Sequence, residues 1–210
     1  MKYPIFASFI IFSLTLMYLI RRRRQKEETT YKSFLDEELR ANSVRKKSLD
    51  DLKLITIPFD TLPMNILKDD PKVKECHRIL KDLADNPIAN LTGFTNTELK
   101  FKYGAPNLEI LSRYDASYTS LARTLSTWAH ILFENGYEAE ALSILEFAVS
   151  TNTDVRTTYD LLGKIYSSHH QSEKIKELIS VATKINSLNK NPILNILDKH
   201  LSESNSDNQA

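Results

Sequence analysis

The sequence of 210 residues contains only four glycines and a single cysteine, Cys76. So few glycines disfavour glycine-rich phosphate loops and many tight β-hairpins, because both use backbone conformations that glycine adopts most easily. One cysteine cannot form an intramolecular disulfide, which excludes a disulfide framework. Cys76 falls on the apolar stripe of a predicted helix, and this favours a buried structural thiol over a nucleophile.

The chain also lacks the short motifs that mark common catalytic and metal sites. It has no G-x-S-x-G, no H-E-x-x-H and no P-loop pattern. His169 and His170 are adjacent in a predicted turn, and Cys76-His77 has no second pair at metal-like spacing. We therefore predict that the protein is not an enzyme and has no catalytic residue, no metal site and no cofactor.

Basic charge is scarce outside one short segment. Lys2 and the run Arg21, Arg22, Arg23 and Arg24 supply five of the 28 basic residues, so positions 25–210 carry 23 basic against 27 acidic residues. Non-specific nucleic-acid binding depends on the neutralisation of many phosphates. A chain segment with a net charge of −4 is poorly suited to that role, and we predict no nucleic-acid partner.

The one long uncharged run extends from Tyr3 to Ile20. As a helix rising about 1.5 Å per residue it would reach roughly 27 Å, close to the thickness of a bilayer core. The arginines follow the run instead of preceding it, and no small-residue cleavage site follows, unlike in a signal peptide. The positive-inside rule then predicts a single-pass membrane protein with a short N-terminus outside, a basic flank at the membrane and a cytoplasmic C-terminal domain.

Changes in composition divide the chain into five predicted regions. Residues 1–24 form a transmembrane anchor with its basic flank, and residues 25–53 a charged juxtamembrane helix or linker. An extended segment with a helical accessory lobe covers 54–107, and helical repeats with caps cover 108–201. Residues 202–210 are predicted to be a disordered polar tail.

Local capping signals predict where helices of the lobe begin. Asp70-Pro71 is an N-cap residue followed by proline in the first helical position. Thr95 and Glu98 have the spacing of a capping box. Near the C-terminus, Pro192 is predicted to start a last apolar helix that caps the preceding elements.

The last third of the chain contains an internal repeat, with the period of about 34 residues that is typical of stacked helical hairpins. Trp128 falls on Leu162 and Ala129 on Gly163 when the two segments are aligned. The small residues of the second pair would let two antiparallel helices approach closely, and Asn135-Gly136 would supply the turn. The residues predicted to pack the repeats are Trp128, Ala129, Gly136, Ala141, Ala148, Gly163, Tyr166 and Ala182.

At these residues the chain resembles the tetratricopeptide repeat family. The resemblance covers two units, at about residues 122–155 and 156–189, and the second departs from the pattern because His170 stands where glycine is usual. Two unrelated helical hairpins at the same spacing are the alternative. The implied fold is mostly α, with a single N-terminal transmembrane helix, a domain of helical-hairpin repeats and a C-terminal capping helix.

Tetratricopeptide repeats usually bind peptides or protein surfaces, so the resemblance implies a membrane-tethered scaffold or adaptor that presents its repeats to a protein or peptide partner at the cytoplasmic face. Two alternatives stay open: a self-assembling structural component of a membrane complex, which would be a homo-oligomer, and a receptor for proteins in transit. In the family the first helix of each hairpin lines the groove. The corresponding positions here are Arg123, Ser126, His130, Phe133, Asp160, Lys164 and Ser167.

Overall fold

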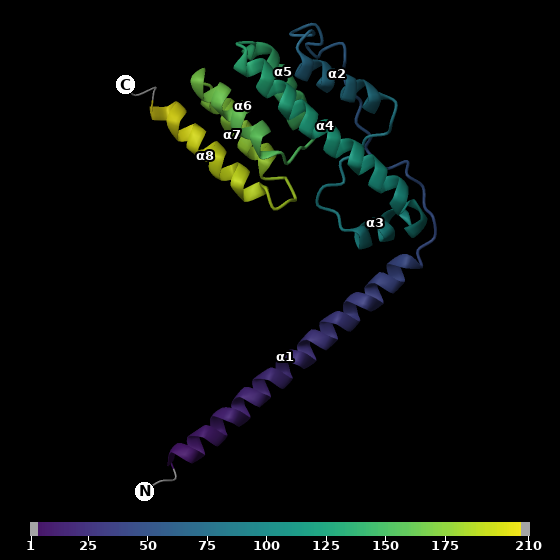
Figure 1. The fold of residues 1–210 in the computed structure, drawn as a ribbon, viewed down its shortest axis with the longest axis vertical. Helices are drawn as coiled ribbons and strands as arrows, with labels where there is room; N and C mark the ends of the chain where they lie inside the picture. Colours follow the sequence, from purple (N-terminus) through teal and green to yellow (C-terminus); the bar gives the residue numbers. More distant parts are fainter. Residues whose placement is uncertain (1–3, 207–210) are drawn as a thin grey trace. The chain divides into compact units, whose positions relative to one another are not determined.

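The computed structural model describes residues 4–206 and is mostly helical, which confirms the predicted predominance of α-helix. Within these residues it contains eight α-helices and one 3-10 helix (Figure 1). They are α1 (Pro4–Asn42), α2 (Pro71–Ala84), α3 (Asn96–Tyr103), η1 (Ala105–Asn107), α4 (Leu108–Glu134), α5 (Glu138–Ser150), α6 (Arg156–Ser168), α7 (Ser172–Ala182) and α8 (Lys190–Ser206).

The chain divides into two compact units. Unit 1 combines the described residues up to Lys47 with Thr95–Leu108, and unit 2 combines Ser48–Phe94 with the described residues from Glu109 onward. Counted over the full sequence, unit 1 holds 13 basic and 6 acidic residues, a net charge of +7. Unit 2 holds 15 basic and 21 acidic residues, a net charge of −6.

The predicted membrane anchor is corrected by the structure. The search of the described residues finds no helix with the length and apolar character needed to cross a membrane. Tyr3, the first residue of the predicted run, lies outside the described residues. The finding contradicts the predicted transmembrane helix and the single-pass topology with a cytoplasmic domain that depends on it.

Residues 4–24 of the predicted anchor and residues 25–42 of the predicted juxtamembrane segment belong to one continuous helix, α1 (Figure 1). Residues 43–53 of the predicted juxtamembrane segment follow it without forming a helix. The arginines at positions 21–24 are exposed on it, and Arg23 pairs with Glu27 one turn later, with 3.1 Å between Nε and Oε1. Large apolar side chains from Phe9 to Ile20 are also exposed.

Within unit 1, α3 packs against α1 through a polar contact near the end of α1. The Glu38 carboxylate accepts a hydrogen bond of 2.7 Å from the Thr97 hydroxyl and pairs with the Lys100 ammonium. These partners, Lys100 foremost, lower the pKa of Glu38. The capping box at Thr95 and Glu98 is confirmed, because each residue's side chain accepts from the backbone N–H of the other.

The start of α2, in unit 2, is also confirmed. The Asp70 carboxylate accepts from the backbone N–H groups of Lys72 at 2.8 Å and Val73 at 3.1 Å, and Pro71 occupies the first turn. The preceding 54–62 segment, predicted to be extended, has no regular secondary structure over 54–58 and turns over 59–62. Its Ile57 and Leu62 are buried in the same apolar core as α2.

The helical hairpins of unit 2 follow the period predicted from the sequence. The helix α7 begins one period after α5, at Ser172 against Glu138, and α8 begins one period after α6, at Lys190 against Arg156. We call the second half of α4, together with α6 and α8, the first helices, and α5 and α7 the second helices. The helix α6 contacts α5, α7 and α8 (Figure 1), so the predicted cap, α8, continues the series as a further first helix.

The predicted disordered tail is corrected in part. The helix α8 continues to Ser206, because Glu203 bonds back to His200 and Lys199 on the preceding turn. Ser204 is buried. Residues 207–210 lie outside the described residues.

Both hairpin turns have the same backbone conformation. Gly136 has a φ of +85°, and His170, at the equivalent position of the next repeat, has a φ of +55°. In each turn the next N–H bonds back to the last helical turn, from Tyr137 to the Leu132 carbonyl at 3.0 Å and from Gln171 to the Tyr166 carbonyl at 2.9 Å. This is the Schellman arrangement, whose left-handed residue is usually glycine.

We expect His170→Gly to stabilise the protein, because it removes the strain of a non-glycine residue in the left-handed region, about 1 kcal/mol. Gly136→Ala is the matched control and is expected to destabilise the protein by about 1 kcal/mol. A Cβ at Gly136 would meet nothing within 4 Å, so only backbone conformation changes. Chemical denaturation of both variants measures the effects, and a His170→Gly protein of lower stability would contradict the assignment.

Candidate functional site

Neighbouring first helices contact each other through residues of the predicted groove. Between α4 and α6, the Ser126 hydroxyl hydrogen-bonds the Thr157 hydroxyl at 2.9 Å. Further along the same two helices, the Lys164 ammonium lies 5.2 Å from the centre of the Phe133 ring. This distance permits a cation–π interaction. The two contacts place α4 and α6 side by side along one face.

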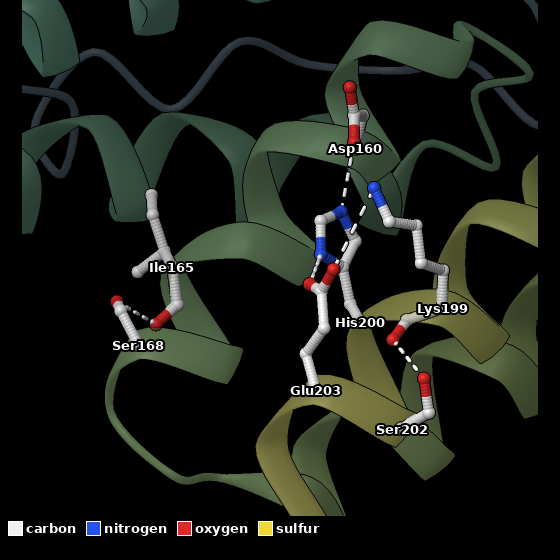
Figure 2. Close-up of polar contacts among 7 residues, drawn as sticks. All are labelled: Asp160, Ile165, Ser168, Lys199, His200, Ser202 and Glu203. Atoms are coloured by element: carbon white, nitrogen blue, oxygen red, sulfur yellow. Dashed lines mark hydrogen bonds and ion pairs between the residues drawn. The ribbon is translucent and has the colours of Figure 1, made fainter. Parts of the chain in front are cut away.

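The next pair of first helices, α6 and α8, meets at His200. Figure 2 shows the imidazole between two carboxylates: its Nε2 lies 2.9 Å from Asp160 Oδ1 and its Nδ1 lies 3.2 Å from Glu203 Oε2. Lys199 adds an ion pair to Glu203, with 3.6 Å between Nζ and Oε1. The two ring nitrogens of His200 therefore face carboxylates of two different helices, Asp160 of α6 and Glu203 of α8.

The approach of α8 to α6 depends on Gly163. A Cβ at this position would lie 2.7 Å from His200 Cδ2 and 3.2 Å from Leu197 Cδ2, closer than carbon atoms pack. The close approach that Gly163 permits is therefore to α8, and the prediction that it lies between the two helices of one hairpin is wrong. The remaining repeat-packing residues are also buried except for Gly136, which is exposed in its turn.

Some of the predicted groove residues are exposed to solvent, and others are buried between helices. Arg123, Asp160 and Lys164 are exposed, and His130 and Phe133 are partly buried. Ser126 and Ser167 are buried, so these two are not available to a ligand. The His130 Nδ1 lies 2.9 Å from the Ser126 carbonyl oxygen of its own helix, which fixes the ring along α4.

The accessible part of this face combines cationic and aromatic side chains. It offers two cationic side chains, Arg123 and Lys164, and a partly exposed aromatic ring, Phe133. Aromatic rings and arginines are enriched among residues that dominate binding energies. Among residues 4–206, no group of three or more His, Cys, Asp or Glu side chains is placed to hold a metal ion.

The residues that sequence reasoning missed are those that α8 contributes. His200 lies one period after Tyr166, so a third register of the repeat would have placed it beside α6. In the first two repeats the equivalent of Leu197 is a small residue, Ala129 or Gly163. The bulky leucine at this position hid the third repeat from the sequence comparison.

A second histidine, His77 of α2, lies under the hairpins. Its ring and the Trp128 indole form a T-shaped pair, with 4.8 Å between centroids and an interplanar angle of 87°. The side chain is 9 % exposed, and its Nε2 has no hydrogen-bond partner among the described residues. Burial lowers the pKa of His77, and the nearby charge of Lys81 lowers it further.

This lowered pKa predicts a loss of stability in mild acid. In the unfolded chain a histidine titrates near about 6.5, so below that pH the unfolded state binds a proton that the folded state does not. The free energy of unfolding should therefore fall as the pH is lowered from about 7.5 to 5.5. Melting temperatures measured across this range should fall less steeply for His77→Leu, and an unchanged slope would contradict the prediction.

Comparison of the chain with protein-family models, curated proteins and solved structures gives no match. The resemblance to tetratricopeptide repeats therefore depends on the residues and the helix geometry described above.

Proposed function

We propose that unit 2 is a protein-interaction module, built as a tetratricopeptide-like series of helical hairpins, whose binding face is formed by the first helices α4, α6 and α8. The observation that carries the proposal is the pair of Phe133 and Lys164. It joins two successive first helices, with 5.2 Å between the Lys164 ammonium and the ring centre, and both side chains remain accessible.

The partner that this face fits is a polypeptide segment with an apolar side chain beside an acidic one. The apolar group would cover the exposed part of the Phe133 ring, where its burial is favourable. The carboxylate would meet Lys164 or Arg123, which face solvent. A second acidic group of the partner would bind less well at the α8 end of the face. The Asp160 carboxylate, which is paired with His200, is exposed there and would repel it.

The test substitutes both members of the pair by alanine. Phe133→Ala/Lys164→Ala should keep the helicity of the protein and reduce recovery of its bound partners about tenfold, the effect of losing one binding anchor. Recovery is measured by quantitative mass spectrometry of proteins co-purified with the full chain.

Lys174→Ala is the matched control. Lys174 is exposed on the second helix α7, and its ammonium lies 5.0 Å from the Tyr166 ring. The control removes the same kind of contact away from the proposed face, and recovery should stay at the level of the unmodified protein. Full recovery by the double variant with an intact fold would place the binding face elsewhere.

A further inference from the structure

A cleft of about 780 Å³ opens in unit 2 between one face of α2 and the preceding 59–68 loop. Phe59 and Met64 of the loop form its apolar part. Lys74, Arg78 and Lys81 line it from α2, with Lys68 at the end of the loop. Their spacing of four and three residues places the α2 side chains on one helical face.

The charge of this cleft contrasts with that of the unit around it. Unit 2 has a net charge of −6, yet no acidic side chain lines the cleft. Arg78 is already bound by Glu75 at 2.7 Å and Asp82 at 2.6 Å. Lys74 has a looser pair with Asp69 at 3.5 Å.

Two cations of the cleft remain for a ligand. Among the described residues, neither Lys68 nor Lys81 has a carboxylate within 4.0 Å. His77 also lines the cleft, and its buried Nε2 lacks a partner. A cleft that combines an apolar wall with uncompensated cations complements a ligand that is both apolar and anionic.

We propose that this cleft binds an acidic peptide segment of a partner protein, with an apolar side chain against Phe59 and Met64 and carboxylates at Lys68 and Lys81. Lys74 and Lys81 stand two turns apart, about 10 Å along the helix, so the cationic wall matches carboxylates distributed along an extended segment. A flat anionic surface fits less well, because Lys68, Lys74 and Lys81 line a cleft that an extended segment can enter. The site is separate from the first-helix face proposed above.

The probe is a fluorescein-labelled peptide of sequence Asp-Glu-Leu-Glu-Asp-Phe-Glu-Asp, titrated with the full chain and followed by fluorescence anisotropy. Lys68→Glu/Lys81→Glu should weaken its binding about tenfold or more. Lys176→Glu/Lys184→Glu makes the same change in net charge at exposed positions outside the cleft and outside α2. It should weaken binding less than about twofold, because distant exposed charges are screened.

A second peptide, with serine in place of leucine and phenylalanine, should also bind about tenfold more weakly, since it loses the apolar contact. Phe133→Ala/Lys164→Ala should bind the probe like the unmodified protein, which separates this proposal from the proposed function.

Three outcomes would overturn the proposal: no binding by the unmodified protein, equal weakening by the two charge-reversed variants, or equal binding of the two peptides. Binding of phosphatidylserine vesicles that requires Lys68 and Lys81, without binding of the peptide, would assign the cleft to a lipid surface instead and would also overturn it.

Discussion

Trp128→Ala is expected to lower the free energy of unfolding by about 3–5 kcal/mol, the usual cost of truncating a fully buried aromatic residue. Trp128 is 0 % exposed and lies in the core shared by α2 and the hairpins. Its Nε1 has no hydrogen-bond partner among the described residues. The loss therefore comes from packing and from the cavity left behind, and urea unfolding followed by circular dichroism measures it.

Leu54→Ala is the control for this substitution. Leu54 belongs to the same unit but is 56 % exposed, so its truncation should change the free energy of unfolding by less than about 0.5 kcal/mol. If the two variants lost similar free energy, Trp128 would not hold α2 against the hairpins.

Gly163→Leu is expected to lower the free energy of unfolding by about 1–3 kcal/mol, because overpacking a close helix contact forces neighbouring side chains and backbone apart. Gly163→Ala tests the same contact with the smallest change. Alanine favours a helix over glycine by about 1 kcal/mol, but its Cβ would lie 2.7 Å from His200 Cδ2. The His200 ring cannot yield without weakening its contacts with Asp160 and Glu203.

Gly163→Ala should also be measured in a protein that carries His200→Ala. Without the imidazole, Gly163→Ala should become neutral or stabilising, since helix propensity then acts against only the Leu197 contact at 3.2 Å. The interaction between the two substitutions is read from a double-mutant cycle. Equal costs of Gly163→Ala in both backgrounds would show that the glycine is not required for the contact between α6 and α8.

The elements that could be predicted from sequence are those that local chemistry determines. The Asp70 N-cap and the capping box of Thr95 and Glu98 each depend on residues within one helical turn, and both are confirmed. The regular spacing of the hairpins also follows from the pattern of small and large residues. The predicted anchor was wrong because the prediction counted uncharged residues, whereas no helix among the described residues has both the length and the apolar character that a membrane span needs.

The candidate site could be predicted only in outline. A helical period assigns positions to one face, but it does not say how closely two helices approach. Ser126 and Ser167 were predicted to line the groove, but they are buried because the neighbouring helices approach closely. The partner of Asp160, His200, comes from a helix outside the two predicted repeats. The cleft beside α2 could not be predicted, because one of its walls is an irregular loop with no periodic pattern.

The most direct test of the proposed binding face is site-specific photo-crosslinking in cells. A photoreactive amino acid replaces Arg123, exposed on the first helix α4, or Glu177, exposed on the second helix α7. The proposal predicts a discrete crosslinked partner from position 123, lost when Phe133 and Lys164 are both alanine, and none from position 177. The same partner crosslinked from position 177 alone would contradict a binding face on the first helices.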